Sequence, residues 1–200
     1  MIHLTTELRS LYPAPKGRAL SKQLDRLDVH CRRFIGLCPF VVLASGGANG
    51  AMDASPRGGE PGFVKVLDDR TLLLPDSRGN NRLDTLENLI ETGRIGMLFM
   101  VPGVDETLRV NGSAKLVGGD VHAACIAGAK RAPKLVIEVS VADAYLHCAK
   151  ALMRAGLWDA SRHVMRSSLP SMGQMLNDQT GSDALVEDQD AMVARYAADL

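Results

Sequence analysis

Apolar residues recur at alternate positions in several short stretches of the chain, and this period of two predicts β-strands. The clearest case is residues 106–117, where Leu108, Val110 and Leu116 fall on one face. A Gly-rich stretch at 45–50, a Gly- and Pro-rich loop at 56–62 and a tight turn at 68–70 separate the first four stretches, which favours two antiparallel hairpins. We expect strands at 40–44, 51–55, 63–67, 71–74, 94–101, 106–117 and 134–141.

Apolar residues at helical spacing predict helices around these strands. Leu83, Leu86 and Leu89 follow this spacing, so a helix is expected from about Leu83 to Thr92. Cys38-Pro39 ends the helical character of the N-terminal segment, and 161–180 is polar without a clear pattern. We expect helices at 20–36, 83–92, 121–126, 142–155 and 187–200.

Many short, hairpin-linked strands predict a mainly β protein with helices, built on a closed or nearly closed antiparallel barrel whose ends the helices cover. A chain of 200 residues fits one domain. We therefore expect a single domain over 1–200, with an N-terminal helical segment at 1–38, the barrel at 40–141 and C-terminal helices at 142–200.

The charge balance narrows the choice of partners. Lys plus Arg and Asp plus Glu each number 23, and zero net charge argues against a nucleic-acid-binding surface. No apolar run is long enough to span a bilayer, and the first residues lack a signal-peptide pattern, so we expect a cytoplasmic protein away from membranes. The cysteines lack zinc-site spacing, which predicts no metal site and reduced, mostly buried thiols at Cys31, Cys38, Cys125 and Cys148.

The segment 72–82 joins an apolar strand to the helix expected at 83–92 through a turn with two arginines and two asparagines. Free backbone N–H groups and the dipole already favour an anion at a helix N-terminus. Guanidinium and amide donors collected there indicate a phosphate site. The alternative is a solvated turn whose Asp, Ser and Asn side chains only cap the helix.

Four segments of the chain together form a recognisable pattern: Asp53–Gly58 with Pro61–Val64, Leu74–Arg82 with Leu86–Leu89, Phe99–Gly103 with Glu106–Gly112, and His147–Leu152 with Leu157–Asp159. Together they resemble the pyridoxamine 5′-phosphate oxidase-related flavoproteins, and the similarity is greatest to a bacterial subgroup of unassigned substrate. The resemblance implies a split β-barrel that binds FMN at the interface of a homodimer and acts as an oxidoreductase on a small molecule.

The resemblance also implies which residues contact the cofactor. The better-studied oxidases have an Arg-Lys pair where this chain has Asn80 and Asn81, so the usual charge is missing and Arg82 could restore it from the next position. Ser55 would lie along the ribityl chain. Candidates for the flavin phosphate are Arg57, Arg78, Asn80, Asn81 and Arg82, and the partner subunit would bring Glu106, Thr107 and Arg109 near the flavin.

His147 and Lys150 lie three residues apart on an expected helix and can therefore face one side. They recur in the subgroup's pattern, which implies a substrate or phosphate contact; a solvated helix surface is the alternative. No side chain identifies itself as a catalytic acid or base. The alternatives to an oxidoreductase are a non-catalytic carrier or sensor that binds FMN or another phosphate-bearing ligand, and reuse of the fold for haem or a deazaflavin.

Overall fold

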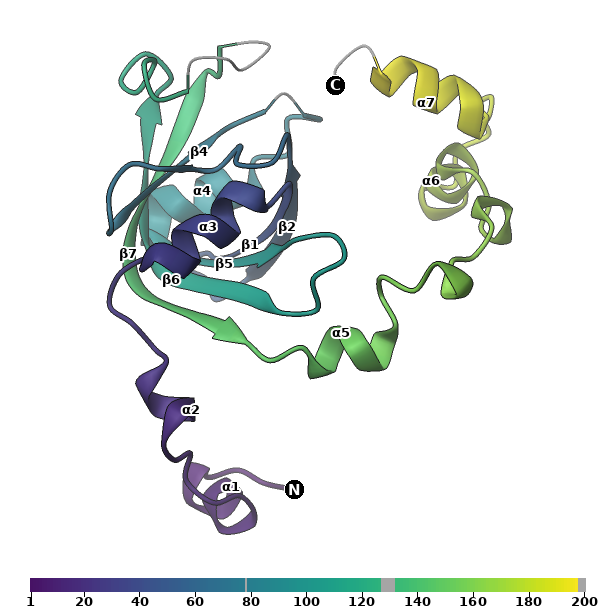
Figure 1. Cartoon of the computed structure of the whole chain (residues 1–200). Helices are drawn as coiled ribbons and strands as arrows, with labels where there is room; N and C mark the ends of the chain where they lie inside the picture. Colours follow the sequence, from purple (N-terminus) through teal and green to yellow (C-terminus); the bar gives the residue numbers. More distant parts are fainter. Residues whose placement is uncertain (78, 127–131, 198–200) are drawn as a thin grey trace. The chain divides into compact units, whose positions relative to one another are not determined.

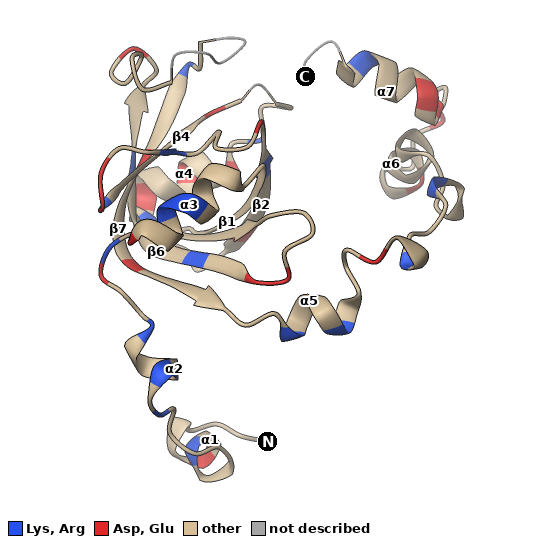
Figure 2. Cartoon of the chain, viewed as in Figure 1, with Lys and Arg blue, Asp and Glu red and all other residues tan. Residues whose placement is uncertain are grey.

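The computed structural model describes residues 1–77, 79–126 and 132–197, and its backbone divides into two compact units, Met1–Trp158 and Asp159–Leu200 (Figure 1). The first unit contains every strand named below and the first five helices. Basic and acidic positions are interspersed along its strands and loops (Figure 2).

Seven strands form one antiparallel sheet in the order β2-β1-β5-β6-β7-β4-β3. Both predicted hairpins are present, β1 with β2 and β3 with β4. The sheet places β2 and β3 at its two edges. The strands are β1 Phe40–Gly46, β2 Met52–Gly58, β3 Lys65–Val66, β4 Thr71–Pro75, β5 Arg94–Met100, β6 Thr107–Gly118 and β7 Leu135–His147.

Two amphipathic helices contribute to the core of this unit. Helix α3, Val29–Leu37, begins where the Asp28 side chain accepts a hydrogen bond from the Cys31 backbone N–H at 2.8 Å, and it contacts β3 and β7. Helix α4, Asp84–Thr92, buries Leu86 and Leu89 and contacts β1, β2, β5 and β6. The predicted helix at 83–92 is therefore confirmed, and it lies directly beside β2.

The longest strand pair, β6 with β7, contains a bulge between Asn111 and Gly112. A Cβ atom at Gly112 would lie 2.0 Å from the Ser140 carbonyl oxygen, so only glycine fits the close approach of the two strands. Glu138 of β7 accepts hydrogen bonds from Lys115 and His122, each at 2.8 Å. These bonds hold the pKa of Glu138 below its usual range.

The helix expected at 142–155 is wrong over its first half. Strand β7 continues to His147 because its residues pair in antiparallel register with Thr107 to Asn111 of β6. Helix α5 is confined to Lys150–Ala155. The helix expected at 121–126 is also wrong, since these residues form turns.

The N-terminal segment also differs from the expected helix at 20–36. Helix α1 spans Thr5–Leu11 and α2 spans Arg18–Ser21. Leu24 then forms a β-bridge with Ala144 of β7, with N–H···O distances of 3.0 and 2.9 Å, so the chain cannot be helical there. The strand expected at 63–67 is shorter in the structure, where β3 spans only Lys65–Val66.

The second unit contains 3₁₀ turns at Ala160–Arg162 and Arg166–Ser168, α6 at Met172–Thr180 and α7 at Gln189–Ala197. Residues 161–180, whose sequence shows no clear pattern, therefore include helix α6. The Ser171 side chain caps the N-terminus of this helix. Helix α7 falls within the helix expected at 187–200.

The cysteines divide equally between the core and the surface. All four thiols are free; Cys31 and Cys38 are buried, whereas Cys125 and Cys148 are exposed, so the expectation of mostly buried thiols is half right. Trp158 donates its indole N–H to the Val104 carbonyl oxygen at 3.0 Å and anchors the end of the first unit.

Candidate functional site

Strand β2 has its polar side chains on its covered face. Asp53, Ser55 and Arg57 are half-buried, while the residues between them are exposed. The three pair across the hairpin with the buried residues Ser45, Leu43 and Val41 of β1. An edge strand that turns polar groups inward needs partners for them there.

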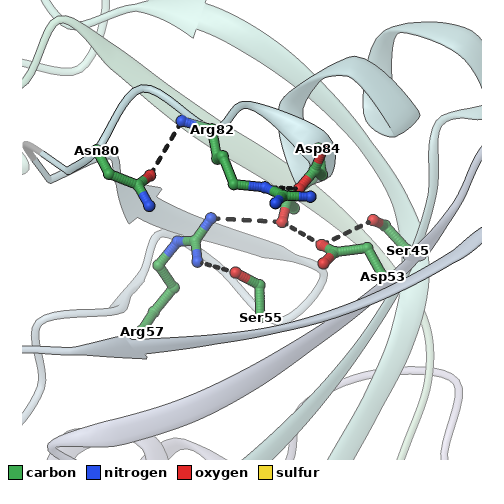
Figure 3. A network of polar contacts seen from close by, with 8 residues as sticks. Ser45, Asp53, Ser55, Arg57, Asn80, Arg82 and Asp84 are labelled. Atoms are coloured by element: carbon green, nitrogen blue, oxygen red, sulfur yellow. Dashed lines mark hydrogen bonds and ion pairs between the residues drawn. The ribbon is translucent and has the colours of Figure 1, made fainter. Parts of the chain in front are cut away.

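The N-terminal turn of α4 supplies one of these partners. Thr85, only 3% exposed, donates its hydroxyl to the Asp53 carboxylate and accepts a hydrogen bond from Arg57 Nη2 at 3.4 Å. Arg57 Nη1 also donates to the Ser55 hydroxyl (Figure 3) and to the Pro56 carbonyl oxygen. These contacts hold the guanidinium between β2 and α4.

Two further side chains extend this network to β1. Ser45 is 2% exposed, donates to the Asp53 carboxylate at 3.5 Å and accepts a hydrogen bond from Asn88 of α4 at 3.0 Å. Asp53 thus has two hydroxyl donors, and Arg57 has no ion-pair partner among the described residues. We call Ser45, Asp53, Ser55, Arg57, Thr85 and Asn88 the β2–α4 network.

The turn before α4 brings a second arginine to the same helix end. Arg82 pairs through Nε with Asp84 at 2.9 Å, and its backbone N–H donates to the Asn80 side chain at 3.0 Å (Figure 3). Asn81 is exposed and has a positive φ of 61°, which Asn tolerates better than most residues. Arg78 lies outside the described residues.

The pKa of the Asp76 carboxyl group depends on both its burial and the charge of Arg57. Burial raises the pKa of Asp76, and the positive charge of Arg57 offsets part of this rise. Arg57 is therefore the cation whose field reaches both the β2–α4 network and the end of β4. A phosphate beside it would meet a positive charge that no carboxylate neutralises directly.

Three of the remaining predicted residues, Thr107, Arg109 and His147, form a second group on β6 and β7. Arg109 and Tyr145 are paired in register, and the guanidinium carbon lies 4.6 Å from the centre of the Tyr145 ring. Thr107 is buried and pairs with His147 in the next row, whereas Glu106 is exposed. β1 and β5 separate this group from β2 within the sheet.

The predicted shared helix face of His147 and Lys150 is wrong. His147 ends β7, and Lys150 begins α5 as an exposed residue, so the two lie on different elements. The ring of His147 instead lies 5.0 Å from that of Tyr145.

Sequence reasoning missed the side chains that position the predicted ones. No sequence motif marks Thr85, Ser45 or Asn88 as a group, and only the packing of α4 on β1 and β2 joins them. Tyr145 was missed because it fell inside the helix expected at 142–155. One signal in the sequence could have indicated the inward polar face of β2, namely the alternation of Asp53, Ser55 and Arg57 with other residues.

Two negative findings apply to residues 1–77, 79–126 and 132–197. No group of three or more His, Cys, Asp or Glu side chains there is arranged to hold a metal ion. None of the helices in these ranges has the length and hydropathy required to cross a bilayer.

Three solved structures align with this chain at low identity. HupZ from Group A Streptococcus aligns with a TM-score of 0.50 and 17% identity, covering 60% of this chain and 92% of HupZ. A histidine-to-alanine variant of HupZ gives 0.51 and 17%, covering 60% and 99%. An FMN-binding protein from Syntrophomonas wolfei gives 0.45 and 13%, covering 58% and 83%. No curated protein sequence matches the chain.

The fold is the split β-barrel that the resemblance implied, an antiparallel seven-stranded sheet with helices. The model of one protein family, described as pyridoxamine 5′-phosphate oxidase, matches residues 27–148. This range contains both the β2–α4 network and the group on β6 and β7, and it spans more than half of the chain. The protein therefore belongs to the pyridoxamine 5′-phosphate oxidase family.

Proposed function

We propose that this protein binds FMN and acts as a flavin-dependent oxidoreductase on a small molecule. The observation that supports this most is the side chain of Arg57, which three hydrogen bonds hold between β2 and α4. Its charge has no ion-pair partner among the described residues. A fixed guanidinium that makes no direct ion pair is the group expected to hold a phosphate monoester.

The residues around Arg57 fit the phosphate end of FMN unequally. Ser55 and Asn80 offer neutral donors, while Arg82 is 78% exposed and paired with Asp84. Arg82 must exchange this carboxylate for the phosphate, so we assign it a smaller contribution than Arg57. When bound, FMN supplies the two-electron chemistry through its isoalloxazine ring, and the protein supplies orientation and electrostatics.

We further propose a homodimer in which the outer face of β1 and β5 is the contact surface. Val42 lies between Pro56 of β2 and Leu98 of β5, and Phe40 lies beside Met100. Phe40, Val42, Leu98 and Met100 are half-buried, and apolar side chains grouped on one face of a sheet are candidates for a protein–protein contact. Leu98 pairs with Arg109, so a partner seated there would approach the group on β6 and β7 as well.

The test begins with the absorption spectrum of the purified protein and mass spectrometry of any ligand released on denaturation. Flavin bands and a mass equal to FMN support the proposal; a colourless protein that takes up no added FMN refutes it. A deazaflavin or haem would be distinguished by the same spectrum. Equilibrium sedimentation that shows a monomer with full FMN occupancy would contradict the dimer.

Two variants test the assignment of the phosphate. Arg57→Ala should weaken FMN binding by roughly tenfold to a hundredfold, because a charge-assisted hydrogen bond contributes about 1.5–3 kcal/mol. Arg82→Ala is the matched control and should have the smaller effect. Equal effects, or no effect of Arg57→Ala, would place the phosphate elsewhere.

Turnover is tested separately from binding. NADH or NADPH should reduce the bound flavin, and a substrate or oxygen should reoxidise it. A protein that binds FMN but resists reduction across a broad panel of donors would be a carrier or sensor instead.

A further inference from the structure

The first 22 residues, which we call the N-terminal arm, contribute nothing to the core of the chain. Residues 1–23 are all exposed, and neither α1 nor α2 buries a residue. Leu4, Leu8 and Leu11 are 60%, 43% and 63% exposed, and their spacing places them on one face of α1. A helix of seven residues is too short to be stable alone in water, because helices in proteins are stabilised mainly by the packing of an apolar face. The arm therefore needs a surface to cover it.

Two contacts hold the base of the arm on β7. Lys22 Nζ donates to the Leu146 carbonyl oxygen at 2.7 Å, and Leu24 forms the β-bridge with Ala144. Residues 12–17, with prolines at positions 13 and 15, follow α1 in the sequence. Prolines favour a stiff, extended backbone, so this segment acts as a spacer between α1 and the base of the arm.

The arm is basic as well as apolar. It contains Arg9, Lys16, Arg18 and Lys22 against a single acid, Glu7. The Glu7 carboxylate caps α1 by accepting hydrogen bonds from two backbone N–H groups. Among the described residues, none of the four bases has an ion-pair partner. The surface that fits the arm is therefore apolar and acidic.

The exposed side of α4 has both of these properties. Leu83 is 47% exposed and Ile90 is 74% exposed. Helix α4 contains three acids and no base, and two of the acids, Glu87 and Glu91, form no ion pair in residues 1–77, 79–126 and 132–197. Positions 83, 87, 90 and 91 recur at helical spacing and share one face. We call Leu83, Glu87, Ile90 and Glu91 the α4 surface.

Helix α3 shows the opposite charge and provides a comparison. Val29 is 72% exposed at its first turn, which makes it as available to the arm as Ile90. However, α3 contains Arg32 and Arg33 and no acid between its first and last residues. A basic arm is repelled there, so charge favours α4 over α3.

The sheet separates the base of the arm from the α4 surface of the same chain. Leu86 of α4 packs in the core with Leu43 of β1 and Met97 of β5. Successive side chains of a strand alternate between the two faces, so Val42 and Leu98 lie on the face away from α4.

The base of the arm lies on this second face. Sheet register places Leu98, Arg109 and Tyr145 in one row across β5, β6 and β7. Lys22 Nζ lies 5.1 Å from the centre of the Tyr145 ring. The row continues into the contact surface proposed above for the homodimer. The arm therefore begins beside the position of a second copy.

We propose that the N-terminal arm of one copy docks on the α4 surface of a second copy. The leucines of α1 cover Leu83 and Ile90, and the bases of the arm lie beside Glu87 and Glu91. In a two-fold dimer the contact forms twice, because each copy supplies one arm and receives another. The second copy is that of the proposed homodimer, so the inference rests on this part of the proposed function and does not depend on FMN.

The experiment is disulfide trapping in the full chain, after Cys125→Ser and Cys148→Ser have removed the exposed thiols. Leu8→Cys combined with Ile90→Cys should give a covalent dimer on a non-reducing gel under mild oxidation. Mass spectrometry of this dimer should find a peptide that joins positions 8 and 90. Leu8→Cys combined with Val29→Cys is the matched control, and it should be trapped far more slowly.

The charges are tested in the same assay. Glu87→Lys adds a positive charge to the α4 surface and should slow the trapping by roughly twofold to fivefold, as expected for an exposed ion pair. Added salt should slow it as well. The inference is overturned if positions 8 and 90 join only within one chain, if no disulfide joins them, or if the Val29→Cys control is trapped as fast.

Two further measurements identify the reason for a failure. Binding of the full chain to phosphatidylglycerol vesicles without the 8–90 disulfide would assign the arm to an anionic lipid surface and overturn the inference. Equilibrium sedimentation that shows a dimer without the disulfide refutes the arm contact alone, whereas a monomer refutes the homodimer as well. A protein that takes up no FMN but forms the disulfide would refute the flavin function and support the arm contact.

Discussion

Thr85 joins the two halves of the β2–α4 network, and removing its hydroxyl tests whether this network holds α4 against the edge of the sheet. The side chain is buried, donates to Asp53 and accepts from Arg57. Thr85→Val keeps the size and branching of the side chain but removes both hydrogen bonds. We expect the protein to fold and to be less stable.

The expected loss of stability depends on the hydrogen bonds that Asp53 and Arg57 keep in Thr85→Val. A hydrogen bond to a charged group contributes about 1.5–3 kcal/mol. Asp53 still has the Ser45 hydroxyl, and Arg57 still has Ser55, so the net loss is close to one bond rather than two. At about 2–4 °C for each kcal/mol in a chain of this size, the melting temperature should fall by roughly 3–12 °C.

The assay is thermal unfolding followed by the fluorescence of Trp158, the single tryptophan, which belongs to the same compact unit. Thr6→Val removes an exposed hydroxyl on α1 and should stay within about 0.5 kcal/mol of the unaltered protein. If Thr85→Val and Thr6→Val have the same melting temperature, the β2–α4 network contributes nothing measurable to stability and the reasoning fails.

Three further predictions concern other parts of the first unit. Gly112→Ala should destabilise by about 1–3 kcal/mol, because its Cβ overlaps the opposite strand, whereas Gly36→Ala, which meets open space in α3, should be stabilising; a denaturant titration compares them. The lowered pKa of Glu138 means that its contribution is complete above the ordinary value of 4.5 and is lost as pH falls through the folded value, so Glu138→Gln should flatten the acid limb of a stability–pH curve; an unchanged limb would refute this. Burial raises the pKa of Cys31 to about 11, so Cys31 and Cys38 should resist a thiol reagent until the protein unfolds, and rapid native labelling of either would contradict their burial.

The sequence predicted the strands well because most have one face in the core, and burial imposes a period of two. It failed at 142–147, where Ala and Leu favour helix locally but pairing with β6 imposes a strand. The site followed the same division. The resemblance named Arg57 and Arg82 as candidates, whereas Thr85 and Tyr145 acquire their contacts only through the packing of elements distant in sequence.

The inward polar row of β2 has a consequence for solubility. β2 is an edge strand, and an unprotected edge offers free N–H and C=O groups to another chain's strand. Charges that point inward, here Asp53 and Arg57, and a proline at position 56 are devices that make such an edge a poor template for aggregation. A variant that replaced both charges with apolar residues would therefore risk edge-to-edge association. The same inward row of β2 that positions the candidate site thus also protects this sheet edge from pairing with another chain.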